Sequence, residues 1–199
     1  MAPSQTKTLS RAGCQGMVSE MSKAKRRMTE SLTLRVESSV LTQIHCEAEQ
    51  KLESVNTLIN QILKQYVKWH AHTPNAGMFY ISRNLMGSLL RKFSDEEIIQ
   101  LSEEEIRDSF KKSFFVFYEE YNLESVLELL DYYSRASGLN YTHRIENNNH
   151  TIIIHPEMGE KASLLLSSLI RNILKTLPIP PSAYDVQQSN GMLIIKIKI

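Results

Sequence analysis

The first clear pattern lies at residues 31–37, where polar and apolar residues alternate strictly. A period of two is typical of a strand with one buried face. The apolar face of this predicted strand would hold Leu32, Leu34 and Val36, and the polar face Ser31, Thr33, Arg35 and Glu37. The preceding residues 1–29 follow neither a strand nor a helix period and are rich in Ser, Thr, Gln, Lys and Arg. We therefore expect them to form a disordered arm.

Two helices are predicted to follow. Ser38 or Ser39 can cap the first, which should end at a break near residues 50–53. Ser54 can cap the second, whose wide apolar stripe recurs at helical spacing and consists of Val55, Leu58, Ile59, Ile62, Leu63, Tyr66 and Val67. So small a unit with one strand cannot pair that strand or cover both helices alone. We expect a symmetric dimer in which residues 32–37 pair with their own copy.

This order of elements resembles the ribbon-helix-helix repressors of the Arc and MetJ type. The resemblance covers about residues 30–70 and is carried by SLTLRVE, the first helix and SVNTLINQILKQYV. It implies an antiparallel ribbon that enters the DNA major groove, and a second helix whose N-terminus holds a backbone phosphate. Carried over by position, the base-reading side chains are Ser31, Thr33 and Arg35, and the phosphate-binding residues are Ser54, Val55 and Asn56.

The turn between the two predicted helices departs from that family. Such proteins often have Gly followed by an aliphatic residue there, whereas this chain has Leu52-Glu53. Leu52 is poorly suited to the left-handed backbone conformation that often ends a helix. Glu53 places a negative charge beside the expected phosphate.

The second half of the chain predicts an α+β domain at residues 80–199, after a linker at 71–79 that contains Pro74, Asn75 and Gly77. Capping-box patterns at Ser94 and Ser102 predict two successive helix starts. The further elements expected are a helix at about 103–119, a helix at 123–136 between Asn122 and Gly138, strands at 139–146 and 150–155, a helix at 159–177, and a hairpin of 184–188 and 192–199 around Asn190-Gly191. The fold class is therefore α+β, with a C-terminal antiparallel sheet and a packed helix.

The pattern of this second half, including HPEMGEKASLLL, resembles the C-terminal part of uncharacterised archaeal ribbon-helix-helix proteins. That resemblance implies no activity. We expect the domain to serve in oligomerisation or in sensing an unknown effector.

Charge is unevenly distributed along the 199 residues, although the net charge is only +1. Residues 1–31 carry six basic and two acidic groups, whereas residues 73–136 carry seven basic and twelve acidic ones. DNA would therefore meet the N-terminal end, and we expect the cluster Lys25, Arg26 and Arg27 to contact phosphates. No apolar run is long enough for a membrane span, and two cysteines cannot build a disulfide framework, so a soluble cytoplasmic protein is expected.

The candidate chemistry outside the DNA-binding unit is limited to three histidines. A two-residue turn at residues 147–148 would place His143 and His150 on one sheet face and His155 on the other. Three histidines on two faces do not converge on one ion, so we expect no metal and no cofactor. The sequence also carries no grouping typical of an enzyme.

These observations lead to one functional interpretation: a homodimeric, sequence-specific DNA-binding transcriptional regulator. Its expected partners are double-stranded DNA and a second copy of the chain. Two alternatives stay open. One is the antitoxin of a toxin–antitoxin pair, and the other is a nonspecific nucleoid protein.

Overall fold

The computed structural model describes residues 29–189 and 191–198, and the chain divides into two compact units, Met1–His45 and Cys46–Ile199. Within the first unit, residues 29–37 lie outside any helix or strand. A ribbon strand pairs with a second chain, so the predicted strand at 31–37 stays a prediction. The arm at 1–28, with Lys25, Arg26 and Arg27, lies outside the described residues.

The two predicted N-terminal helices are present. Helix α2 spans Ser38–Gln50, and the carbonyl of Glu37 accepts its first hydrogen bond from the Leu41 amide, so the helix begins at Ser38 rather than after a serine cap. Helix α3 spans Val55–Gln65 and continues as the π-helix η2, Tyr66–His70. The break predicted near residues 50–53 is confirmed.

A helical stretch follows, made of α4 (Arg83–Leu90), α5 (Asp95–Glu105), η3 (Ile106–Phe110), α6 (Lys111–Phe117) and α7 (Leu123–Ala136). The capping box at Ser94 and the Asn122 cap of α7 are confirmed. The second helix start, at Ser102, is wrong. Ser102 is buried inside α5, where its hydroxyl donates to the Ile99 carbonyl and accepts from the Asn172 amide at 3.2 Å. No Gly or Pro interrupts the chain there, so the helix continues through Ser102.

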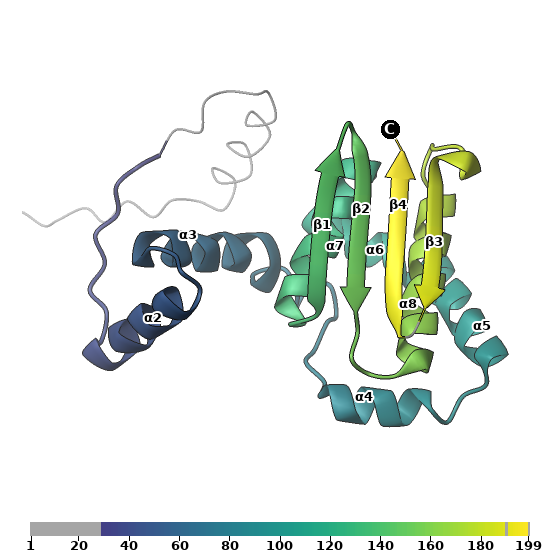
Figure 1. The fold of residues 1–199 in the computed structure, drawn as a ribbon, viewed down its shortest axis with the longest axis horizontal. Helices are drawn as coiled ribbons and strands as arrows, with labels where there is room; N and C mark the ends of the chain where they lie inside the picture. Colours follow the sequence, from purple (N-terminus) through teal and green to yellow (C-terminus); the bar gives the residue numbers. More distant parts are fainter. Residues whose placement is uncertain (1–28, 190, 199) are drawn as a thin grey trace, which may run out of the picture. The chain divides into compact units, whose positions relative to one another are not determined.

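The C-terminal sheet has four antiparallel strands in the order β1-β2-β4-β3: β1 (Asn140–Glu146), β2 (Asn149–His155), β3 (Tyr184–Ser189) and β4 (Met192–Lys198). Helix α8 (Glu160–Lys175) and the short η4 (Pro181–Ala183) connect β2 to β3. Figure 1 shows α7 and α8 on the same side of the sheet. The predicted α+β class and the antiparallel sheet with a packed helix are confirmed.

Strand register explains where the core lies. Pairing aligns Ile152 with Ile195 and Ile154 with Leu193, so these side chains share one face. They are buried together with Ile197 against residues of α6, α7 and α8 that include Phe114, Val126, Leu127, Ile170 and Leu174. Burying one such side chain stabilises the fold by about 1.5 to 3 kcal/mol.

An aromatic contact joins η2 to the second half of the chain. Trp69 is buried, stacks on Phe117 with ring centroids 4.9 Å apart, and meets Tyr133 edge-on at 6.0 Å. In the predicted linker at 71–79, the Ala76 carbonyl accepts from the Ser113 hydroxyl at 3.3 Å. These contacts hold the segment against α6 and α7.

The first residue of α4 connects two loops below the sheet. The Arg83 guanidinium donates to the carbonyls of Ser137 and Gly138 and pairs with the Glu157 carboxylate at 2.9 Å. Gly138 and Glu157 both have positive φ, at 61° and 56°. The Arg83 side chain therefore connects the α7–β1 and β2–α8 loops.

No helix in the described ranges is long and apolar enough to cross a membrane.

Candidate nucleic-acid interface

The turn between α2 and α3 has a defined hydrogen-bond pattern. The amide of Glu53 donates to the Ala48 carbonyl at 3.0 Å, and the amide of Leu52 donates to the Glu49 carbonyl at 3.1 Å. This pair of bonds is the Schellman motif that ends a helix and requires a left-handed residue after its cap. Leu52 occupies that position with φ 56°, and its side chain is 95% exposed. Leucine thus adopts the conformation that glycine usually provides.

The Schellman turn leads directly into the N-terminus of α3. The Ser54 hydroxyl accepts from the Thr57 amide at 3.1 Å, and the Ser54 carbonyl accepts from the Leu58 amide at 3.0 Å. The first turn of α3 contains no acidic residue, and Asn56 is exposed. The amide groups of a helix N-terminus and its dipole attract anions. Ser54, Val55 and Asn56 are therefore brought together in a geometry that can hold a phosphate.

The carboxylate of Glu53 is tied to the body of α3. Its Oε2 atom accepts from the Gln61 side-chain amide at 2.7 Å, and its Oε1 atom is buried without a hydrogen-bond partner in the part of the chain described. This contact was not predicted, because its local signal is only that residue 61 lies two helical turns after residue 53. The acidic side chain that departs from the family pattern is thus bonded to the helix two turns beyond its N-terminus.

Large apolar side chains are exposed in this region. In the first unit, Leu32 is 71% and Leu34 52% exposed. In α3, Ile62 and Leu63 are 45% and 43% exposed. These side chains are available for contact with a partner, and the dimer stays a prediction.

The predicted site residues fall into three groups. Ser31, Thr33 and Arg35 are exposed and belong to the first compact unit. The α3 residues 54–56 belong to the second unit and lie at one helix end. The arm residues 25–27 lie outside the described part. The structure therefore places residues 54–56 at one helix N-terminus, and both phosphate binding and base reading stay predictions.

The histidines adopt the predicted register. His143 pairs with Ile152 across β1 and β2, and Nε2 of His143 lies 2.9 Å from Nδ1 of His150. Burial lowers the pKa of His143, and the charge of His150 lowers it further, against an opposing effect of Asp131. No three His, Cys, Asp or Glu side chains in the described ranges are grouped to hold a metal ion.

Comparisons with known proteins add no relative to this description. No protein-family model, no curated protein and no solved structure matches the chain.

Proposed function

We propose that the protein is a homodimeric, sequence-specific DNA-binding transcriptional regulator of the ribbon-helix-helix type. The observation that carries the proposal is the α2–turn–α3 segment, in which a Schellman turn at Leu52 is followed directly by the serine-capped N-terminus of α3. It follows a segment of strict polar–apolar alternation at residues 31–37. That order of elements resembles the ribbon-helix-helix unit, in which a ribbon enters the major groove.

The phosphate contact is supported by the charge at the end of α3. Amides of the first turn carry partial positive charge, and that turn contains no acidic residue. The Glu53 carboxylate before the turn opposes the contact and is bonded to Gln61. An arm bearing Lys25, Arg26 and Arg27 would add sequence-independent attraction to the DNA backbone.

The dimer is supported by exposed apolar side chains. Leu32, Leu34 and Val36 share one face of an alternating segment and are exposed in a single chain. Pairing residues 32–37 with a second copy would join the two apolar faces and leave Thr33 and Arg35 on the opposite face, toward DNA. Arg35 would then read guanine, because its planar guanidinium can donate two hydrogen bonds to O6 and N7.

The test is a selection of bound sequences from a random pool of duplex DNA with the full chain. The native protein, Arg35→Lys and the control Arg144→Lys are compared, since Arg144 is an exposed arginine on β1. We expect one enriched motif with two-fold symmetry for the native protein and the control. The Arg35→Lys protein should bind the unselected DNA pool nearly as well as the native protein but enrich a motif with weaker base preference. A lysine keeps the charge but cannot donate the two parallel hydrogen bonds of a guanidinium.

The alternatives give different results. Retention of DNA without any enriched motif would favour a nonspecific nucleoid protein. Enrichment that depends on a co-purified protein partner would favour an antitoxin. Absence of DNA binding would refute the proposal.

A further inference from the structure

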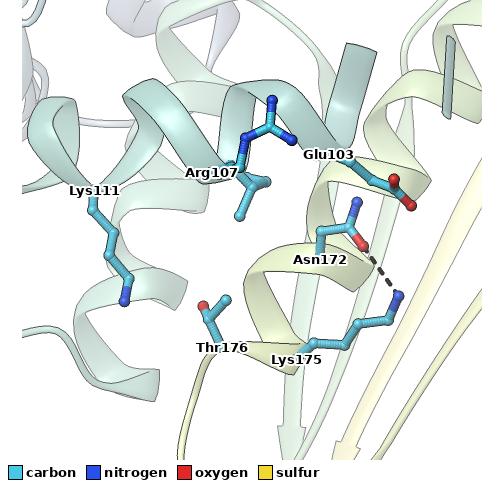
Figure 2. Close-up of a pocket in the computed structure, with 7 residues that line it drawn as sticks. Glu103, Arg107, Lys111, Asn172, Lys175 and Thr176 are labelled. Atoms are coloured by element: carbon cyan, nitrogen blue, oxygen red, sulfur yellow. Dashed lines mark hydrogen bonds between the residues drawn. The ribbon is translucent and has the colours of Figure 1, made fainter. Parts of the chain in front are cut away.

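A shallow cavity of about 430 Å³, largely open to solvent, lies between η3 and the C-terminal end of α8 (Figure 2). This size is in the range of small-molecule sites. Its wall is formed by Glu103, Ile106, Arg107, Lys111, Asn172, Lys175 and Thr176. It is remote in sequence from the α2–α3 unit, and the proposed DNA binding does not use it.

Basic groups outnumber acidic ones around this cavity. Three cationic side chains and the single carboxylate of Glu103 line it. The Arg107 guanidinium is bonded to Asp108 at 2.9 and 3.1 Å, and in Figure 2 it points away from Thr176. In the described ranges, neither of the two lysines that line the cavity, Lys111 and Lys175, forms an ion pair with a carboxylate. Lys111 and Lys175 therefore supply positive charge at the cavity that is not paired with a carboxylate in the described ranges.

The two lysines differ in what explains their position. Lys175 lies in the last turn of α8, where a cation is stabilised by the helix dipole, and its amine donates to Asn172 at 3.1 Å. Lys111 lies 5.3 Å from the centre of the Tyr121 ring and four residues after Arg107. A cation over the face of an aromatic ring is attracted by the ring. The position of Lys111 is therefore explained by Tyr121, as that of Lys175 is by the end of α8 and Asn172.

Backbone and polar groups at the cavity give it a defined shape. Ile106 and Arg107 belong to the π-helix η3, a local geometry that frequently occurs at functional sites. The Thr176 hydroxyl donates to the Ile173 carbonyl at 2.7 Å and lies 2.6 Å from the Tyr121 hydroxyl. In Figure 2 Thr176 lies between Lys111 and Lys175, whose ammonium groups lie on opposite sides of it, that of Lys175 beside Asn172.

We propose that this cavity binds a small anionic molecule whose negative charge is attracted by Lys111 on one side and by Lys175 on the other. The buried side chain of Ile106 would contact the apolar part of the molecule. The ligand would touch both η3 and α8, and α8 packs against α5 and the sheet. Binding there would therefore tighten the contact between the helical layer and α8.

The test is a titration of the full chain without DNA, followed by the methyl resonance of Ile106. The probes are sodium octanoate, inorganic phosphate and octyltrimethylammonium, which combines a similar tail with a positive charge. We expect saturable shifts with an anionic probe and a dissociation constant on the order of 1 mM for a ligand of this size. The tighter of the two anionic probes identifies the head group.

Lys111→Gln and Lys175→Gln should each weaken binding about three- to tenfold, as expected for loss of a partly exposed charge-assisted contact. The matched control is Lys112→Gln, which removes an exposed charge one residue from Lys111 but outside the cavity. Circular dichroism checks that each variant is folded. Equal weakening by Lys112→Gln, equal binding of octyltrimethylammonium, or no saturable shift with octanoate or phosphate would overturn the proposal.

Discussion

Replacing Leu52 with glycine should stabilise the protein, although the change deletes a large apolar side chain. Leu52 has φ 56° and is 95% exposed, so its side chain contributes almost no burial in the single chain. The left-handed conformation costs a non-glycine residue about 1 to 2 kcal/mol. Glycine removes that cost because it has no Cβ atom.

The expected gain in the free energy of unfolding is smaller than the full cost of the left-handed conformation at residue 52, because glycine is also more flexible in the unfolded chain. That flexibility costs about 0.5 to 1 kcal/mol. The difference leaves a net stabilisation of between about 0 and 1.5 kcal/mol for Leu52→Gly, or about 0.75 kcal/mol at the middle of both ranges. Leu52→Ala is the matched control, since it deletes the same exposed side chain but keeps the Cβ atom and hence the strain. Its stability should stay within about 0.5 kcal/mol of the native protein.

Urea unfolding followed by circular dichroism measures both variants. Protein concentration is held equal, because dimerisation would make the transition concentration-dependent. The midpoint should rise for Leu52→Gly with an unchanged slope. If Leu52→Ala were as stable as Leu52→Gly, the left-handed strain at this turn would not exist and the reasoning would fail.

Three further predictions concern other parts of the chain. Gly87→Ala would place a Cβ atom 2.8 Å from the Met158 carbonyl oxygen, an overlap that costs about 1 to 3 kcal/mol and should outweigh the roughly 1 kcal/mol gain in helix propensity. Urea unfolding should therefore show a lower free energy of unfolding for Gly87→Ala but not for the control Ser88→Ala. We expect the native chain to sediment as the proposed ribbon dimer in analytical ultracentrifugation and Leu34→Asp to abolish that dimer, because pairing would bury an unpaired charge; a persisting dimer would exclude the ribbon. Because the pKa of His143 is lowered in the folded protein, the unfolded chain binds more protons, and stability should fall as the pH drops through 6.5. The melting temperature of His143→Gln should fall less over that range than that of the native protein, and an identical pH dependence of the two would contradict this.

Elements with strong local signals were predictable from the sequence. The Ser94 capping box, the Asn122 cap of α7 and the pairing of His143 with Ile152 all follow from residues a few positions apart, and the structure confirms them. Caps and tight turns satisfy backbone groups within one or two turns of chain, so their residue types carry the information.

Other features were decided only by the tertiary structure. Ser102 carries the same local signature as Ser94, but Asn172 of α8 bonds its hydroxyl and α5 continues through it. The bond from Gln61 to Glu53 and the stacking of Trp69 on Phe117 likewise depend on where the helices are placed.

The charged cavity has the same origin. Lys111 and Lys175 are 64 residues apart in the sequence and line one cavity only because η3 and α8 lie side by side. Local patterns determine where a helix or strand begins and ends, since those choices depend on neighbouring backbone groups. Which distant side chains meet depends on how the apolar faces pack, because many pairings of similar faces bury comparable apolar area and only the folded chain selects one of them.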